Sequence, residues 1–389
     1  MTTFKDFLAE ELDESKLKHL EHAEDHVINA GHEGFSHAYH NLKDVHDKLT
    51  GKKNDTKVTM KYDGSPSVVF GRHPETGRFF VASKSAFNKN PKINYTLEDI
   101  ERNHGHAPGL VSKLRAALQH LPKVTPKKGV FQGDIMHTAE DVHESDGRVH
   151  FTPNTITYSA PKNSAHGKAA LNSKIGVAIH TKYNGKNLED MQAEHGAQLN
   201  DFGLHKDVHL ISTEHHLDNI KFTPQNRERF AKAMTAAAAH NKKAKPETYE
   251  AIKGHEIPLK TYINHTVRTG TKPSVEGFMN HYMKAHQKKI EGVKMAASKA
   301  SKTDAMESDI GHVQRNRAHF ENVLNQHKHL QKAKDILAHT LSSSAEFDHS
   351  INGKKSKPEG FVVVRHNRPT KIVDRAEFSA ANFNKVKAQ

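Results

Sequence analysis

The stretch Lys57–Phe70, KVTMKYDGSPSVVF, decides the fold. Apolar and polar side chains alternate over Thr56–Tyr62, which is the period-two pattern of a half-buried strand, and Ser67–Phe70 predicts a second strand after an Asp-Gly turn. Pro74–Gly77 has the composition of a turn, and a third strand is expected over Arg78–Ser83. Strands that follow one another so closely predict an antiparallel hairpin or meander rather than a Rossmann unit.

Similar signals continue along the chain. They predict a helix over Gly109–His120 and strands over Gly129–Met136, Thr155–Ser159 and Ile175–His180. Before Leu49, apolar residues recur at steps of three and four, which predicts two or three N-terminal helices. The mixture indicates an α+β fold built on an antiparallel sheet.

The second half of the sequence is mainly helical. Helices are expected over Arg227–His240, Val275–Ala300 and Val313–Leu341, and strand signals return at Phe361–Val364 and Thr370–Val373. A helical segment therefore interrupts one sheet domain. The expected segments are an N-terminal helical segment (1–50), the first part of the sheet domain (55–184), a helical insertion (185–345) and the last part of the sheet domain (355–389).

Composition limits the classes of partner. The 389-residue chain has no cysteine, which excludes a disulfide-linked partner and a thiolate zinc site. No apolar run reaches membrane-spanning length and no targeting segment is visible, so we expect a cytoplasmic protein without a membrane partner. The net charge of +13 favours a polyanion such as nucleic acid, and solubility alone is the alternative explanation.

Histidine is unusually abundant, with 33 residues. His19, His22 and His26 are spaced to share one helical face. Metal binding would also need an orienting carboxylate shell, so a solvated or partly buried helix face is the favoured interpretation.

Lys61 stands at the expected end of the first strand and is followed by Tyr62, Asp63, Gly64 and Ser65. A lysine becomes a nucleophile when nearby cations or desolvation lower its pKa, and a neighbouring glycine lets a phosphate approach the backbone. The pentapeptide therefore predicts attack on a phosphate to form a phosphoramidate. The alternative is an exposed lysine followed by an ordinary Asp-Gly turn.

The chain resembles the covalent nucleotidyltransferase superfamily of DNA ligases, RNA ligases and mRNA capping enzymes, motif after motif in order. Lys61–Gly64 is similar to the Lys-x-Asp-Gly box, and the Ser65 that follows is closest to phage-type RNA ligases. Ser83–Ser85 is similar to the next motif, which is basic and hydroxylic. Phe131–Asp134 resembles the third, an aromatic-x-Gly-acid strand, with Asp134 where the family usually has Glu.

The later motifs follow the same order. Ile175–His180 stands where the family has an aromatic-bearing strand that packs on the nucleobase, and the nearest rings are those of His180 and Tyr183. Pro358–Val363 looks like the fourth motif, in which Glu-Gly opens a buried strand.

Lys371–Asp374 is similar to the fifth motif, which usually carries two alternating lysines. Val373 occupies the second lysine position, and Arg375 could substitute only if the backbone bends. The resemblance covers roughly residues 55–179 and 358–383.

The resemblance implies a nucleotidyltransferase fold, the ATP-grasp-like adenylation domain of ligases, with ATP and Mg²⁺ or Mn²⁺ as cofactors. Lys61 would take AMP from ATP and pass it to a 5′-phosphate end, and a 3′-hydroxyl would then displace AMP. The implied site comprises the nucleophile Lys61, the nucleotide-binding residues Asp63, Gly64, Lys84, Asp134 and Lys371, and the metal ligand Glu359.

RNA is the expected substrate. DNA ligases and capping enzymes follow the fifth motif with a complete OB domain, for which the sixteen residues after Val373 leave no room, and RNA ligases often lack this domain. The basic insertion, with Lys242, Lys243, Lys245 and Lys328, would grip the strand or serve only as a scaffold. The family likeness suggests nucleic acid repair during phage infection, by a viral protein in the host cytoplasm. A DNA ligase, a nucleotidyltransferase of another acceptor and an inactive nucleic-acid-binding protein remain the alternatives.

Overall fold

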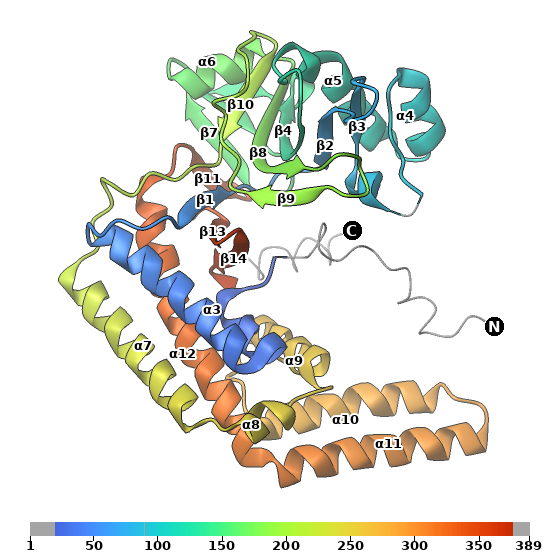
Figure 1. Cartoon of the computed structure of the whole chain (residues 1–389), viewed down its shortest axis with the longest axis vertical. Coiled ribbons are helices and arrows are strands. Elements are labelled where there is room, and N and C mark those ends of the chain that lie inside the picture. Colours follow the sequence, from blue (N-terminus) through green and yellow to red (C-terminus); the bar gives the residue numbers. More distant parts are fainter. Residues whose placement is uncertain (1–19, 89, 376–389) are drawn as a thin grey trace. The chain divides into compact units, whose positions relative to one another are not determined.

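Strand β1 (Lys57–Lys61) pairs antiparallel with β13 (Gly360–Arg365), so segments from opposite ends of the sequence share one ladder. The computed structural model describes residues 20–88 and 90–375 (Figure 1). The chain forms two units. The sheet unit contains Leu20, Asp55–His216 and Ser344–Pro369, whereas the helical unit contains Glu21–Asn54 and Leu217–Ser343 and resumes at Thr370.

A six-stranded sheet forms the centre of the sheet unit, in the order β10–β8–β4–β2–β3, with β9 also paired to β8 (Figure 1). The strands are β2 (Ser67–Arg72), β3 (Phe79–Ala82), β4 (Val130–Thr138), β8 (Ile175–Asn184), β9 (Gln192–His195) and β10 (Val208–Ser212). The predicted β2–β3 hairpin is confirmed, and the β4 and β8 strands fall where the sequence places them. The sheet is mainly antiparallel, as expected, but β10 runs parallel to β8.

Two helices cover one face of this sheet. They are α4 (Leu97–His104) and α5 (Pro108–His120), and the predicted helix over 109–120 is thereby confirmed. Thr96 and Asp99 form a capping box at the start of α4, which satisfies amide groups that the first turn leaves unpaired. Apolar side chains of α5 pack with sheet side chains such as those of Phe70 and Phe131 in one hydrophobic core.

A five-stranded antiparallel sheet completes the sheet unit, in the order β12–β11–β7–β6–β5. Its strands and the nearby helix are β5 (His143–Ser145), β6 (Arg148–Phe151), β7 (Thr157–Pro161), β11 (Asp348–Ile351), β12 (Lys354–Ser356) and α6 (Ala165–Asn172). Short 3₁₀ helices are η2 (Lys84–Phe87), η3 (Leu121–Lys123), η4 (Ala139–Asp141) and η5 (Ser342–Ser344).

The boundary between sheet and helical regions differs from the expected one at residues 184 and 185. The sheet unit continues to His216 because β9 hydrogen-bonds to the second half of β8 and β10 to its first half. In addition, the N-terminal helical segment is not separate, because α3 (His26–Leu49) packs within the helical unit against α12 (Arg317–Leu341).

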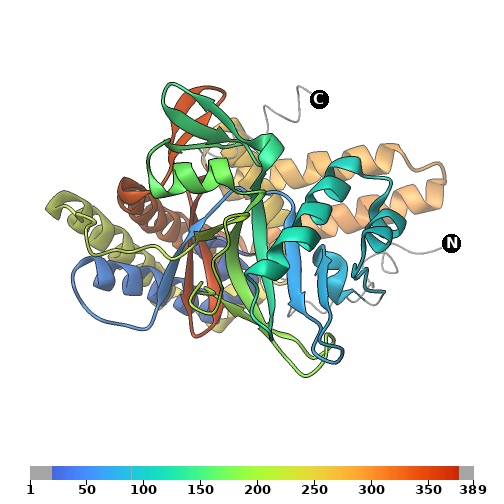
Figure 2. The same ribbon diagram turned by 90° about the horizontal axis from the view of Figure 1, so that it is seen from above.

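The helical unit is organised around α12, which lies beside α3 and α7 (Figure 1). The remaining helices are η1 (Ala23–Asp25), α7 (Pro224–Lys243), α8 (Pro246–Glu250), α9 (Glu256–Thr269), α10 (Val275–Glu291) and α11 (Ala296–Arg315). Helices α10 and α11 lie side by side in both views (Figure 2). The chain re-enters this unit within β14 (Arg368–Val373).

Several helical predictions need correction. The run Val275–Ala300 is divided between α10 and α11, and Val313–Leu341 is broken at Asn316, whose backbone is not helical. By contrast, the expectation of at least two helices before Leu49 agrees with α3, which consists of two helical segments divided by the non-helical residues Ala30 and Gly31. No helix of residues 20–88 and 90–375 combines the length and apolarity that a membrane crossing requires.

Candidate active site

Lys61 and Glu359 form the centre of the candidate site. Lys61 is the last residue of β1 and pairs with Gly360, the first residue of β13, so its side chain meets that of the preceding Glu359. The ammonium group of Lys61 forms an ion pair with the Glu359 carboxylate; the two side chains are 27% and 9% exposed. The sheet thus brings together two predicted site residues that lie far apart in sequence.

Glu359 is held in an unusual electrostatic state. Burial raises its pKa to about 7, although Lys61 pulls in the opposite direction, and the nearby Asp63 and Asp134 carboxylates raise the pKa further. Oxygen Oε1 contacts Lys61, whereas Oε2 is buried and has no hydrogen-bond partner among residues 20–88 and 90–375. A buried carboxylate oxygen of this kind fits a hard divalent cation, since Mg²⁺ is commonly held by one or two carboxylates together with water and substrate phosphates.

Asp134 lies on β4 and its side chain is 24% exposed. Burial by itself would raise the pKa of Asp134, but His180, Lys61 and Ser67 outweigh it and lower the pKa below the usual value. The Nε2 atom of His180 lies 3.7 Å from the Asp134 carboxylate. Asp134 is therefore an ionised acceptor close to Lys61.

Gly64 is required by the packing of the turn after β1. A Cβ atom at Gly64 would lie 2.5 Å from the Cβ of Asp134, closer than two carbon atoms tolerate. The N–H of Ser65 donates to the carbonyl of Ile135 at 3.0 Å, and the N–H of Ile135 donates to the carbonyl of Pro66 at 3.0 Å, which fastens the turn to β4. Glycine here allows the Lys61 turn to reach Asp134.

Gly133 has a similar structural role in β4. A Cβ atom there would lie 2.7 Å from the carbonyl oxygen of Ala178 in β8. This glycine permits close approach of the two strands at a point where the β4–β8 register shifts.

Asp63 anchors a loop. Its carboxylate accepts hydrogen bonds from the side chain of Asn154 at 2.8 Å and from the backbone N–H groups of Thr155 at 2.8 Å and Ile156 at 3.1 Å. Its own N–H donates to the Tyr158 hydroxyl at 2.6 Å. Asp63 therefore connects the Lys61 turn to the loop before β7 and fixes the direction in which the chain leaves β1.

A cavity opens beside Lys61, lined by side chains from several strands of the sheet unit. The lining residues are Leu20, Thr59, Met60, Lys61, Tyr62, Asp134, Ala178, His180, His195, Gly196, Thr213, Val362 and Val364. The walls are largely aliphatic and aromatic, and the charged groups of Lys61 and Asp134 converge on one part of the cavity. Such a lining is typical of a small-molecule site.

Two imidazoles line this cavity. His180 stands where the resemblance places a base-packing aromatic residue, whereas Tyr183 is buried in the core and donates its hydroxyl hydrogen to Gln132 at 2.6 Å. Burial, with a smaller contribution from His180, lowers the pKa of His195 to about 4, so His195 is a neutral ring at pH 7. No local signal in the sequence marks His195; its pairing with Thr181 across β8 and β9 brings it to the cavity.

Two predicted residues, Lys84 and Lys371, are not among those that line the cavity. Lys84 begins η2, is exposed and does not line the cavity. Lys371 belongs to the helical unit, where its N–H donates to the carbonyl of Glu21 at 2.8 Å. Val373, at the second lysine position of the fifth motif, is a buried apolar residue and supplies no positive charge.

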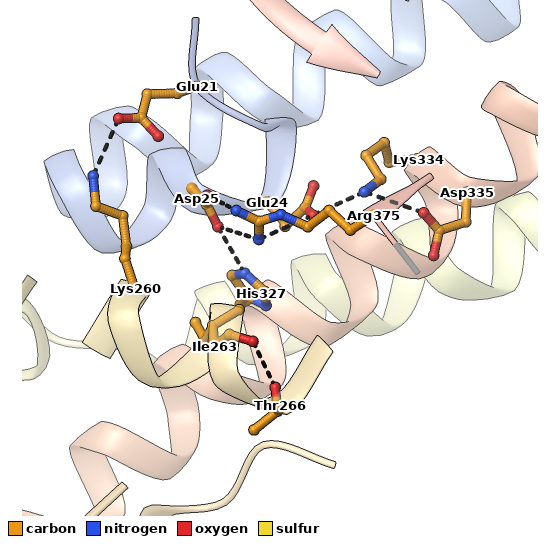
Figure 3. A network of polar contacts seen from close by, with 10 residues as sticks. All are labelled: Glu21, Glu24, Asp25, Lys260, Ile263, Thr266, His327, Lys334, Asp335 and Arg375. Atoms are coloured by element: carbon orange, nitrogen blue, oxygen red, sulfur yellow. Dashed lines mark hydrogen bonds and ion pairs between the residues drawn. The ribbon is translucent and has the colours of Figure 1, made fainter. Parts of the chain in front are cut away.

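The helical unit contains a separate cluster of buried charges (Figure 3). Asp25 accepts hydrogen bonds from Arg375 at 3.0 Å and from His327 at 3.0 Å, and Glu24 accepts one from Lys334 at 2.8 Å. Arg375 is therefore engaged with Asp25 and is not the substitute lysine considered above. Although Glu24, Asp25 and His327 offer three ligand atoms within 4.8 Å of one another, the cluster already contains two cations, which disfavours a metal ion.

The predicted histidine face is not formed as expected. His22 precedes the helix and makes a parallel β-bridge with Lys371, and burial lowers its pKa well below the usual value. His26 begins α3 and contacts the hydroxyl of Thr370 at 3.1 Å. His19 lies outside the described residues.

Comparison with known proteins gives one match. A family model described as a family of unknown function (DUF6267) matches residues 17–387, which is nearly the whole chain. No curated protein and no solved structure matches the chain.

Proposed function

The chain belongs to the family of unknown function DUF6267, and we propose that it is an ATP-dependent polynucleotide ligase that forms a covalent lysyl-AMP on Lys61. One observation carries the proposal. The Lys61 ammonium contacts the buried Glu359 carboxylate at the wall of a cavity that Asp134 and His180 also line. A nucleophile, a carboxylate with a raised pKa and a largely apolar pocket are thereby combined in one site.

The first step would be nucleotidyl transfer to Lys61. Its Nζ forms a bond to the α-phosphorus of ATP, while the bond from that phosphorus to the bridging oxygen breaks and pyrophosphate leaves with the electron pair. Only the neutral amine attacks, so the ammonium must first release a proton. Oxygen Oε1 of Glu359 contacts this ammonium and, because the pKa of Glu359 is about 7 without a bound cation, can take up the proton near neutral pH before the cation binds.

A divalent ion, Mg²⁺ or Mn²⁺, would be held at the free Oε2 of Glu359, with water and substrate phosphates completing its coordination. When bound, it would neutralise charge on the phosphates during transfer. Lys84, which belongs to the same unit as Lys61, is proposed to add fixed positive charge for the same purpose, as its position in the family motifs implies.

The cavity supports a nucleotide as the bound molecule. Neutral His195 and the His180 ring provide flat aromatic surfaces, and Met60, Val362 and Val364 provide aliphatic walls suited to a nucleobase. The ionised Asp134 is an acceptor suited to a ribose hydroxyl. ATP is the proposed nucleotide, and its adenine would lie against these walls.

RNA ends with 5′-phosphate and 3′-hydroxyl groups are the proposed substrate, on the resemblance of Lys61–Ser65 to phage-type RNA ligases. A nucleic acid repair role in the cytoplasm of an infected host follows from the same likeness. DNA ends, or an acceptor that is not a polynucleotide, are the alternatives for the second step. If Lys61 is not adenylated at all, the alternative is an inactive nucleic-acid-binding protein.

The test is transfer of label from α-labelled ATP in the presence of MgCl₂. We expect label to stay on the denatured wild-type protein and to be absent from Lys61→Ala, while Lys168→Ala, which removes an exposed lysine of the same unit, labels normally. An unlabelled wild type would refute the enzyme proposal. Joining assays on single-stranded RNA, nicked RNA and nicked DNA then identify the acceptor, and sealing of DNA alone would refute the choice of RNA.

A further inference from the structure

A basic groove lies between α7 and α12 in the helical unit. Helix α7 begins at Pro224, with the Thr223 side chain capping it, and packs along α12. The groove is lined by Asn226, Arg229, Lys328, Gln331, Lys332, Asp335, Ile336 and His339. Three cations therefore face one concave surface.

The cations of this groove have no acidic partners. No carboxylate of residues 20–88 and 90–375 lies within ion-pair distance of Arg229, Lys328 or Lys332. Asp335 is the only carboxylate in the lining, and it is itself paired with the buried Lys334 at 3.1 Å. The groove therefore keeps a net positive charge.

Lys243 extends the positive charge along α7, beyond a pair of stacked histidines. His240 of α7 and His329 of α12 stack with ring centroids 5.5 Å apart. Besides burial, Lys328 helps to lower the pKa of both histidines, and Lys243 lowers that of His240. Lys243 follows Arg229 by fourteen positions on α7. This spacing corresponds to about 21 Å of helix at 1.5 Å per residue. Such a length can follow several phosphates of a polynucleotide.

The chemistry of the groove favours a phosphate backbone over an acidic protein. Protein interfaces depend on buried apolar or aromatic anchors, and none of the exposed large hydrophobic residues of the described chain, Leu171, Leu204, Ile257 and Met295, belongs to α7 or α12. The lining also contains no Phe, Tyr or Trp, the rings on which nucleobases most often stack, which favours contact with the backbone. Several cations along two packed helices suit a repeating anion of any sequence.

We infer that the groove formed by Arg229, Lys328 and Lys332 binds the phosphate backbone of a polynucleotide without regard to sequence. The choice of a polynucleotide among polyanions rests on the proposed function. The groove would serve as a strand-holding surface on a unit separate from the one that carries Lys61.

The test measures anisotropy of a labelled RNA oligonucleotide of mixed sequence with the full chain, over a range of salt concentrations. For the triple variant Arg229→Gln, Lys328→Gln, Lys332→Gln, we expect affinity to fall on the order of 100-fold near 0.1 M salt, and the slope of log affinity against log salt to decrease by about 2. The control variant Lys272→Gln, Lys299→Gln, Lys302→Gln makes the same change in net charge at exposed positions of the same unit and should bind as the wild type does.

Equal losses in the two triple variants would overturn the inference, because net charge alone would then explain binding. Tighter binding of polyglutamate than of RNA would also overturn it and assign the groove to an acidic protein. A DNA oligonucleotide of the same sequence distinguishes the two nucleic acids, and similar affinities are expected because the groove reads phosphates. Lys61→Ala should still bind RNA. A wild type that takes no label but loses RNA affinity selectively in the groove variant would refute only the proposed function. A labelled wild type whose RNA affinity is the same in the groove variant would refute only the groove.

Discussion

Replacing Glu359 with glutamine should make the sheet unit more stable at neutral and alkaline pH while abolishing label transfer. The pKa of Glu359 rises on folding from 4.5 to about 7 because the carboxyl is buried. Between these two values the folded chain binds a proton that the unfolded chain does not, so stability falls as pH rises through this window. Above pH 7 the free energy of unfolding is therefore lower by about 3 kcal/mol than it is below pH 4.5.

Glu359→Gln removes this penalty because glutamine stays neutral. We expect a gain of about 2–3 kcal/mol near pH 8, or a rise in Tm of about 5–10 °C for a unit of this size, and almost none near pH 4. Calorimetry of the wild type and the variant in the presence of a chelator, at pH 8 and at pH 4, measures the two differences. His137, His195 and His349, whose pKa values fall to about 4, change wild type and variant alike, so they cancel in the difference.

Glu140→Gln is the matched control, since Glu140 is exposed in the same unit and its loss should leave Tm unchanged. A Glu359→Gln variant that is no more stable than wild type near pH 8, or that shows the same gain near pH 4 as near pH 8, would refute the reasoning. Addition of MgCl₂ extends the test. A bound ion should raise the Tm of the wild type and leave that of Glu359→Gln unchanged, and equal rises would exclude Glu359 as the ligand.

Two further substitutions test the packing of each unit. Lys334→Met should lower the free energy of unfolding in urea by about 3–5 kcal/mol, because it leaves Glu24 buried beside one cation fewer. The double variant Lys334→Met, Glu24→Leu should recover part of this loss. A Lys334→Met variant as stable as the wild type would contradict the reasoning. Gly64→Ala should lower the free energy of unfolding by about 1–3 kcal/mol and reduce label transfer, because the added Cβ would collide with Asp134. The control is Gly109→Ala on α5, where the added Cβ meets open space, so this variant should be neutral or slightly stabilising. Equal effects of the two alanines would show that Gly64 is not held by this contact.

The parts of the fold with strong local signals could be predicted from sequence. Alternation around Lys61, the turn at Pro74–Gly77 and the periodic run over Gly109–His120 all describe structures that form among close neighbours in the chain. The meeting of Lys61 with Glu359 was accessible only through the order of motifs, because nothing local to either residue indicates that β1 and β13 pair.

Features that depend on distant partners escaped prediction. Strand β9 has the sequence QAEH, which lacks an apolar alternation, and it exists because β8 offers a free edge over Thr181–Asn184. His195 reaches the cavity for the same reason. Likewise, Glu24 and Lys334 are fully buried although their types are normally exposed, and each is stabilised by a partner 310 residues away.

The histidines illustrate why composition misleads about metal sites. The rings of His137, His209 and His166 form a chain with contacts of 3.1 and 3.0 Å, and His166 then meets Glu346 at 3.2 Å. A neutral imidazole has one donor and one acceptor nitrogen, so the neutral His209 donates to one of its two neighbours and accepts from the other. His209 uses both its nitrogens within the chain and has none left for a metal ion. The burial that lowers the pKa of His137 and His209 keeps them neutral at pH 7, so these residues are hydrogen-bonded core groups rather than ligands.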